Sequence, residues 1–212
     1  MNRLVFSQRL HGSFLALLLV LSILPPALAD TADERKGSRE GAFVNIKNFG
    51  KVNDHIYRGG QPKGDDYRQL IELGVKTIVD LRSDSEPEAK AAAERAGLRY
   101  INLPMAPKSY PQADAAKRFL EIVNDQANGL VYVHCAGGRH RTGAMLAIYR
   151  MEVDGWNIER AYQEMKDYDF YTRFGHGCYK DYVYDYNRAL QTRNQANPAS
   201  SVKTAVTAGQ QE

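Results

Sequence analysis

The 212-residue chain has few cysteines and little charge imbalance. It has two cysteines, Cys135 and Cys178, and a disulfide between them would block thiolate chemistry at Cys135. The formal net charge is +3, and residues 30–212 carry 26 basic and 25 acidic residues, because Arg3 and Arg9 are the only charged residues before them. A nucleic-acid binder usually shows a basic face or a high domain pI. Any recognition of anions must therefore be local.

Several motifs that define other enzyme classes are missing. The sequence has no GxxxxGK[ST] nucleotide loop and no GxSxG nucleophile elbow. The five histidines show no His-x-x-x-His spacing that would predict a metal site. These absences exclude the common nucleotide-loop, serine-hydrolase and histidine-metal patterns.

The chain has one long apolar run, and it lies near the N-terminus. Phe14–Leu24 follows Arg3 and Arg9, and Ala27-Leu28-Ala29 forms a small-x-small cleavage site. The run is shorter than the roughly 20 residues that span a bilayer. We therefore predict that residues 1–29 are a cleaved signal peptide. We expect an exported protein, periplasmic or secreted, with no stable membrane insertion after cleavage.

The remaining chain divides into a folded body and two polar ends. Residues 30–41 are charged and predict a flexible leader, whereas residues 191–212 are rich in Asn, Gln, Ala, Ser and Thr and predict a disordered tail. Within the body, residues 42–190, strand and helix signals alternate. Predicted strands cover 55–58, 75–81, 98–103 and 130–134; predicted helices cover 65–73, 86–96, 111–123, 141–153, 157–165 and 179–190. This order predicts a single α/β domain with a mainly parallel central sheet flanked by helices.

The segment "HCAGGRHRTG" joins the fourth predicted strand to an apolar helix. A free thiol titrates near pH 8.5, but Arg141, the hydroxyl of Thr142 and the peptide N–H groups of the loop would all stabilise a thiolate at Cys135. Gly137 and Gly138 permit the backbone angles that such a loop needs. The same groups would bind a phosphate or sulfate, and the helix N-terminus adds a positive dipole.

A loop that holds a tetrahedral oxyanion above a thiolate is suited to attack on phosphorus. The planar guanidinium of Arg141 can bind two phosphoryl oxygens and follow them into the transition state. Hydrolysis then divides into formation of a phosphocysteine at Cys135 and a second attack by water. This chemistry requires no metal and no cofactor.

"HCAGGRHRTG" resembles the His-Cys-(five residues)-Arg-Thr-Gly signature of the cysteine-dependent protein tyrosine and dual-specificity phosphatases. The stretches "NFGKVNDHIYRGGQP", "GVKTIVDLRSD" and "MEVDGWNIERAYQEM" resemble exported bacterial phosphatases of the TpbA type, and "FLEIVNDQANGLVYVHCAGGRHRTG" is similar to atypical plant and fungal members. The resemblance implies a phosphatase-like α/β fold, with Cys135 as the nucleophile and Arg141 as the phosphate clamp. It implies that His134 tunes the thiolate through the cysteine backbone. The implied substrate-binding residues are Ala136, Gly137, Gly138, Arg139, His140, Arg141 and Thr142.

The sequence departs from this family at the general acid. Members usually carry an aspartate after the preceding strand, but here the first carboxylate after that strand is Asp114, in the first turn of a predicted helix. Asp114 could protonate the leaving group or simply complement the helix dipole. Asp167 and Asp169 are the alternative acids.

We therefore expect a phosphomonoester hydrolase that acts on phosphotyrosine proteins, with phosphoserine and phosphothreonine as further substrates. An inositol phosphate or pyrophosphate is the alternative substrate. A catalytically silent phospho-ligand binding module is the alternative class. Cys178 could form a disulfide with an oxidised Cys135 or be inert.

Overall fold

The computed structural model describes residues 44–84 and 87–197. The predicted signal peptide, leader and residues 198–212 lie outside the described residues. The strands are β1 (Gly50–Lys51), β2 (Ile56–Gly59), β3 (Thr77–Arg82), β4 (Arg99–Met105) and β5 (Val131–His134). The helices are α1 (Asp66–Glu72), α2 (Pro87–Arg95), α3 (Ala115–Asn124), α4 (Arg141–Glu152), α5 (Ile158–Asp167) and α6 (Gly177–Ala196).

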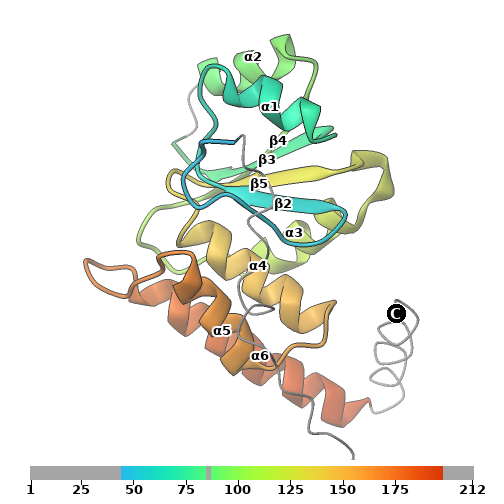
Figure 1. Ribbon diagram of the computed structural model, residues 1–212. Helices are drawn as coiled ribbons and strands as arrows, with labels where there is room; N and C mark the ends of the chain where they lie inside the picture. The colour runs from blue at the N-terminus through green and yellow to red at the C-terminus, as the bar shows by residue number, and fades with distance from the viewer. Residues whose placement is uncertain (1–43, 85–86, 198–212) are drawn as a thin grey trace, which may run out of the picture. The chain divides into compact units, whose positions relative to one another are not determined.

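The strands form one sheet in the order β1–β2–β5–β3–β4. The pairs β2–β5, β5–β3 and β3–β4 are parallel, and only the short edge strand β1 runs antiparallel, beside β2. Helices α1 and α2 cover one face, while α3 and α4 cover the other, with α5 and α6 beyond α4 (Figure 1). The predicted α/β domain with a mainly parallel sheet is confirmed.

Successive side chains along a strand point to opposite faces of the sheet, so each face has its own apolar core. Ile78 and Tyr132 pack with α1 and α2, whereas Val79 and Val133, one residue further along, pack with α3 and α4. Cys135 continues the alternation of β5 and belongs to the second core. The nucleophile candidate therefore lies on the α4 side of the sheet.

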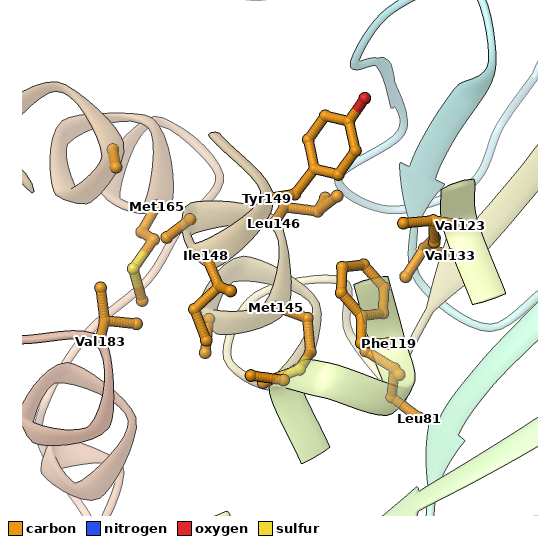
Figure 2. Packing of buried hydrophobic residues seen from close by; sticks show 14 of the residues in the cluster. Leu81, Phe119, Val123, Val133, Met145, Leu146, Ile148, Tyr149, Met165 and Val183 are labelled. Atoms are coloured by element: carbon orange, nitrogen blue, oxygen red, sulfur yellow. The ribbon is translucent and has the colours of Figure 1, made fainter. Parts of the chain in front are cut away.

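Helix α4 is buried along almost its whole length. On one side Leu146 and Met145 lie near Phe119 of α3 and Val133 of β5, and on the other Ile148 lies near Met165 of α5 (Figure 2). A helix that is apolar on most faces can bury all of them only at the centre of the domain. This packing fixes the position of the first residue of α4, Arg141, which directly follows the loop 135–140.

Three features differ most from the sequence-based expectation. Strand β1 was not predicted, because two residues carry no periodic signal. Helix α3 begins at Ala115 rather than at residue 111, after a turn in which Ala115 N–H donates to the Gln112 carbonyl. Helix α6 continues to Ala196, so the predicted tail is helical over residues 191–196. This polar last stretch is held by Arg193, whose guanidinium lies 2.6 Å from Glu152 at the end of α4.

Within the part of the chain that the structure describes, no helix is both long and apolar enough to cross a bilayer.

Candidate active site

Cys135 lies directly after β5, at the carboxyl end of the four parallel strands. In open parallel sheets this edge is where ligands bind. The loop from Cys135 to His140 leads into α4, whose first residue is Arg141. The Cys135 side chain is buried, and so are Arg141 and Thr142.

Three carbonyl groups of this loop accept hydrogen bonds from the segment 48–61. The Gln61 N–H donates to the Ala136 carbonyl at 3.3 Å, and Asn48 Nδ2 donates to the Gly137 carbonyl at 2.8 Å. Arg58 Nη2 donates to the Gly138 carbonyl at 2.9 Å. In a trans peptide the N–H points away from the carbonyl. These three bonds therefore turn the N–H groups of the loop away from residues 48–61, as an anion cradle requires.

Two glycine pairs meet where the loop packs against the end of β2. Gly138 has a φ of +68°, and a Cβ there would lie 2.5 Å from the Gly59 carbonyl carbon. A Cβ on Gly60 would lie 3.2 Å from the Lys47 carbonyl oxygen and 3.3 Å from that of Ala136. Glycine at position 138 is thus required both by the backbone angle and by the close approach.

The surroundings of Cys135 favour its thiolate. Burial raises the pKa of the thiol, but the hydroxyl and N–H of Thr142, the charge of Arg141 and the N–H of Gly137 oppose it and bring the pKa below its ordinary value. The net result is a buried sulfur that ionises more readily than a free cysteine.

Arg141 is anchored from the end of β4. Its Nη1 donates to the Met105 carbonyl at 3.2 Å and lies 3.5 Å from Asp84 Oδ1, on a carboxylate that is two-thirds exposed. These contacts occupy Nη1. The remaining donors of the guanidinium are available to a ligand above Cys135.

His134 lies behind the nucleophile, in the core on the α1 side. Its ring stacks on Tyr132, and Nδ1 lies 3.3 Å from the Cys135 carbonyl and 3.9 Å from Asp80. Burial lowers the pKa of His134 to about 4 against the opposing charge of Asp80, so the imidazole is neutral at pH 7. Asp80 is itself paired with Arg82 at 2.8 Å. The neutral ring lies beside the Cys135 backbone, and the tuning of the thiolate that the family resemblance implies for His134 stays a prediction.

A pocket of about 410 Å³ opens above Cys135, and we call it the Cys135 pocket. The residues that line it are Lys47, Pro107, Cys135, Ala136, Gly137, Arg139, His140, Arg141, Tyr171, His176 and Tyr179. Three of these side chains are permanent cations, four carry aromatic rings, and none is a carboxylate. The pocket is therefore electropositive and ring-lined, which suits a phosphorylated ligand.

The three candidate acids lie elsewhere. Asp114 occupies the N-cap position of α3 without a capping hydrogen bond, and its half-exposed carboxylate lies 3.8 Å from Arg118. Asp167 accepts a hydrogen bond from Gln163 on α5. Asp169 lies 3.9 Å from Arg139 Nε and is mostly exposed. The structure brings none of these carboxylates into the lining of the pocket.

Both cysteines are free thiols. Cys178 lies in the first turn of α6, where Sγ contacts the Gly175 carbonyl at 3.5 Å and burial raises the pKa of its thiol. Among the described residues, no group of three His, Cys, Asp or Glu side chains is placed to hold a metal ion.

Comparison with known proteins identifies the family. The model described as "DSP-PTPase phosphatase fused to NAD+ Kinase" matches residues 44–174. The chain belongs to this dual-specificity phosphatase family. The resemblance inferred from the sequence is thereby confirmed.

Individual relatives agree with that family, and a solved structure shares the fold. Dual specificity protein phosphatase TpbA from Pseudomonas aeruginosa strain UCBPP-PA14 is 28% identical over 142 residues, which cover 67% of this chain and 64% of TpbA. Inositol diphosphatase DSP2 from Oryza sativa subsp. japonica is 26% identical over 134 residues, covering 57% and 61%. The chain thus spans under two thirds of the length of these relatives. The core catalytic domain of the PP-IP phosphatase SIW14 from S. cerevisiae shares the fold, with a TM-score of 0.58 at 23% identity over 71% of this chain and 95% of that domain.

Sequence reasoning missed several residues of the site. The strand-loop-helix signal located the loop itself, but Lys47, Asn48 and Arg58 precede it by about 80 residues and carry no local signal of contact with it. His176 and Tyr179 lie at and just inside the start of α6, and no local signal in the sequence places that helix beside the pocket. The side-by-side position of β2 and β5 brings the first group to the site.

Proposed function

We propose that the protein hydrolyses phosphate monoesters through a phosphocysteine at Cys135. The observation that carries the proposal is the Cys135 pocket, in which a buried thiol of lowered pKa shares an electropositive lining with Arg141. A thiolate is the nucleophilic form of cysteine, and an adjacent guanidinium binds the oxygens of the group under attack. A site with both is built for phosphoryl transfer to sulfur.

In the first step, the Cys135 thiolate forms a bond to phosphorus while the ester P–O bond breaks. The N–H groups from Ala136 to Arg141 and the Arg141 guanidinium hold the three equatorial oxygens, whose charge they neutralise. The leaving oxygen departs with the electron pair of the ester bond and takes up a proton. In the second step, water attacks the phosphocysteine and Cys135 leaves as a thiolate, stabilised again by Thr142.

Phosphotyrosine is the substrate class that the pocket supports best. The rings of Tyr171 and Tyr179 line the pocket beside the cations, and aromatic walls favour an aryl ester. A phenol is also a better leaving group than an alcohol and depends less on protonation by a general acid. This property suits a pocket whose lining contains no carboxylate. The relative TpbA is a dual specificity protein phosphatase, which supports this reading.

An inositol diphosphate is a second candidate substrate. Lys47 and Arg139 line the pocket in addition to Arg141, so more positive charge is present than one phosphate needs. The relative DSP2 is an inositol diphosphatase and the structural neighbour SIW14 is a PP-IP phosphatase, which supports this reading.

We further propose export to the periplasm or medium after removal of residues 1–29.

The test is hydrolysis of p-nitrophenyl phosphate without added metal and under reducing conditions. We expect turnover by the wild type, loss of at least about 10³-fold for Cys135→Ser because the nucleophile is removed, and little change for Cys178→Ser. Equal turnover by Cys135→Ser and the wild type would contradict the proposed nucleophile. Phosphate binding without any turnover by the wild type would identify a silent binding module instead.

The two substrate classes are separated by comparing kcat/KM for phosphotyrosine peptides and diphosphoinositol polyphosphates. The phosphotyrosine proposal predicts the higher value for the peptides and a small effect of Lys47→Met. A higher value for the diphosphoinositol compounds, falling steeply in Lys47→Met, would instead select the second candidate.

A further inference from the structure

Two histidines of the Cys135 pocket stack on one another. The imidazole of His140, at the end of the loop, and that of His176, just before α6, have centroids 3.7 Å apart and planes inclined by 8°. The ring of Tyr171 meets both edge-on, at 4.5 Å from His140 and 5.3 Å from His176. Residues far apart in the sequence thus form a compact imidazole pair on the wall of the pocket.

Each imidazole has a buried nitrogen without a hydrogen-bond partner. These atoms are Nε2 of His140 and Nδ1 of His176. Most buried polar groups in proteins are paired, so two unpaired nitrogens on adjacent rings point to a role in the site. A neutral imidazole nitrogen without a proton is an acceptor that can take one up.

We propose that the His140–His176 pair takes up one proton when a dianionic phosphoryl group enters the Cys135 pocket, and delivers that proton to the leaving oxygen. This inference rests on the proposed function and supplies the acid that no carboxylate in the pocket lining provides.

The charges around the pair explain why the proton arrives with the substrate. Burial is the largest cause that lowers the pKa of His140, which falls to about 4. The neighbouring His176 and the charges of Arg139 and Arg141 lower this pKa further, and a hydrogen bond with the Tyr171 backbone raises it. Burial, Lys108, Arg141 and Arg139 lower the pKa of His176. An entering dianion opposes these cations and favours the protonated ring.

The remaining titratable and charged groups near the pair come from every element packed against it. They are the ammonium group of Lys47, the Cys135 thiol, the phenols of Tyr171 and Tyr179, the guanidinium of Arg173 beside Tyr171, and the carboxylates of Asp169 beyond Arg139 and of Asp84 beyond Arg141. Burial raises the pKa of Tyr179 to about 12, so this phenol stays neutral. Two imidazolium rings at 3.7 Å would repel one another strongly. The pair therefore holds a single proton.

The proton balance closes over the two steps. As Cys135 Sγ bonds to phosphorus and the ester P–O bond breaks, the imidazolium proton passes to the leaving oxygen and leaves the pair neutral. In the second step the pair accepts a proton from the attacking water as the P–S bond breaks and the Cys135 thiolate departs. The cycle ends with the pair protonated, as it began with substrate bound, and with inorganic phosphate in the pocket.

The first test measures proton uptake on binding of sulfate, which does not itself titrate near pH 6. It uses the full chain carrying Cys135→Ser, which removes the thiol titration, and calorimetry in buffers of different ionisation enthalpy. We expect uptake of a substantial fraction of one proton per sulfate. The uptake should fall to near zero when His140→Gln and His176→Gln are added, and should be unchanged with His55→Gln, an exposed histidine just before β2. Undiminished uptake in the double histidine variant would overturn the proposal.

The second test compares phenyl phosphate with p-nitrophenyl phosphate, whose better leaving group needs less protonation. For His140→Gln/His176→Gln we expect kcat/KM to fall about 10²-fold on phenyl phosphate but less than about tenfold on p-nitrophenyl phosphate. His176→Phe, which keeps a stacked ring, should show the same direction if the double variant is unstable. Equal losses on both substrates would overturn the acid role. A wild type inactive on both would contradict the proposed function itself.

Discussion

At the scale of single residues, Gly138 shows how tightly the loop is specified. It has a left-handed φ, its carbonyl accepts from Arg58, and its Cα faces the Gly59 carbonyl. A side chain at this position would therefore displace either the loop or the end of β2. In either case the N–H groups beside Cys135 would move, and catalysis depends on their placement to within about 1 Å.

We predict that Gly138→Ala lowers kcat/KM for p-nitrophenyl phosphate by about 10²-fold, because the cradle is displaced. The matched control is Gly97→Ala, since Gly97 also has a positive φ, +87°, but nothing lies within 4 Å of its would-be Cβ. The control should lose some thermal stability and keep its activity. Equal activity of the two variants would contradict the packing argument.

At the scale of elements, α4 and α5 are joined by a buried ion pair. Arg150 Nη2 lies 2.7 Å from Glu164 Oε1, and both side chains are more than nine-tenths buried. Removal of one partner leaves a charge in the core, which usually destabilises a protein strongly. The pair therefore fixes how α5 packs on α4, and with it the path of the chain towards Tyr171 and His176.

We predict that Glu164→Gln lowers the free energy of unfolding by about 3 kcal/mol, measured by urea denaturation, because Arg150 loses its main buried counter-charge. Glu159→Gln, on an exposed position of the same helix, should change it by less than about 0.5 kcal/mol. A loss for Glu164→Gln no larger than that of the control would show that the buried pair contributes nothing.

The elements also show what the sequence could and could not predict. Helices α1, α2, α4 and α5 and strands β3–β5 were predicted closely, because apolar periodicity and helix-ending glycines are local signals. The end of α6 was missed because its last turns are polar and are held by Arg193 and Glu152, a contact between distant parts of the sequence. The start of α3 was misplaced because a turn and a first helical turn have similar sequence preferences.

At the scale of the whole molecule, a chain of small net charge places three cations and no carboxylate in the lining of the Cys135 pocket. The sequence predicted the Cys135-to-Thr142 loop because its eight residues are contiguous. The supporting residues 47–61 and the histidine partner at position 176 could not be predicted, since only the strand order and the packing of α6 bring them to the site. Likewise, proximity in the sequence made Asp114 the leading acid, whereas the structure pairs it with Arg118 on α3.

The account depends most on an ionised sulfur at Cys135 in the resting protein. The direct measurement is the pH dependence of iodoacetamide alkylation of Cys135 in the full chain carrying Cys178→Ser. Since Thr142 and Arg141 lower the pKa of this thiol, the rate should reach half its maximum below about pH 8.5, the value for a free cysteine, and Arg141→Met should move that midpoint upward. A midpoint at or above about pH 8.5, unchanged by Arg141→Met, would contradict the account.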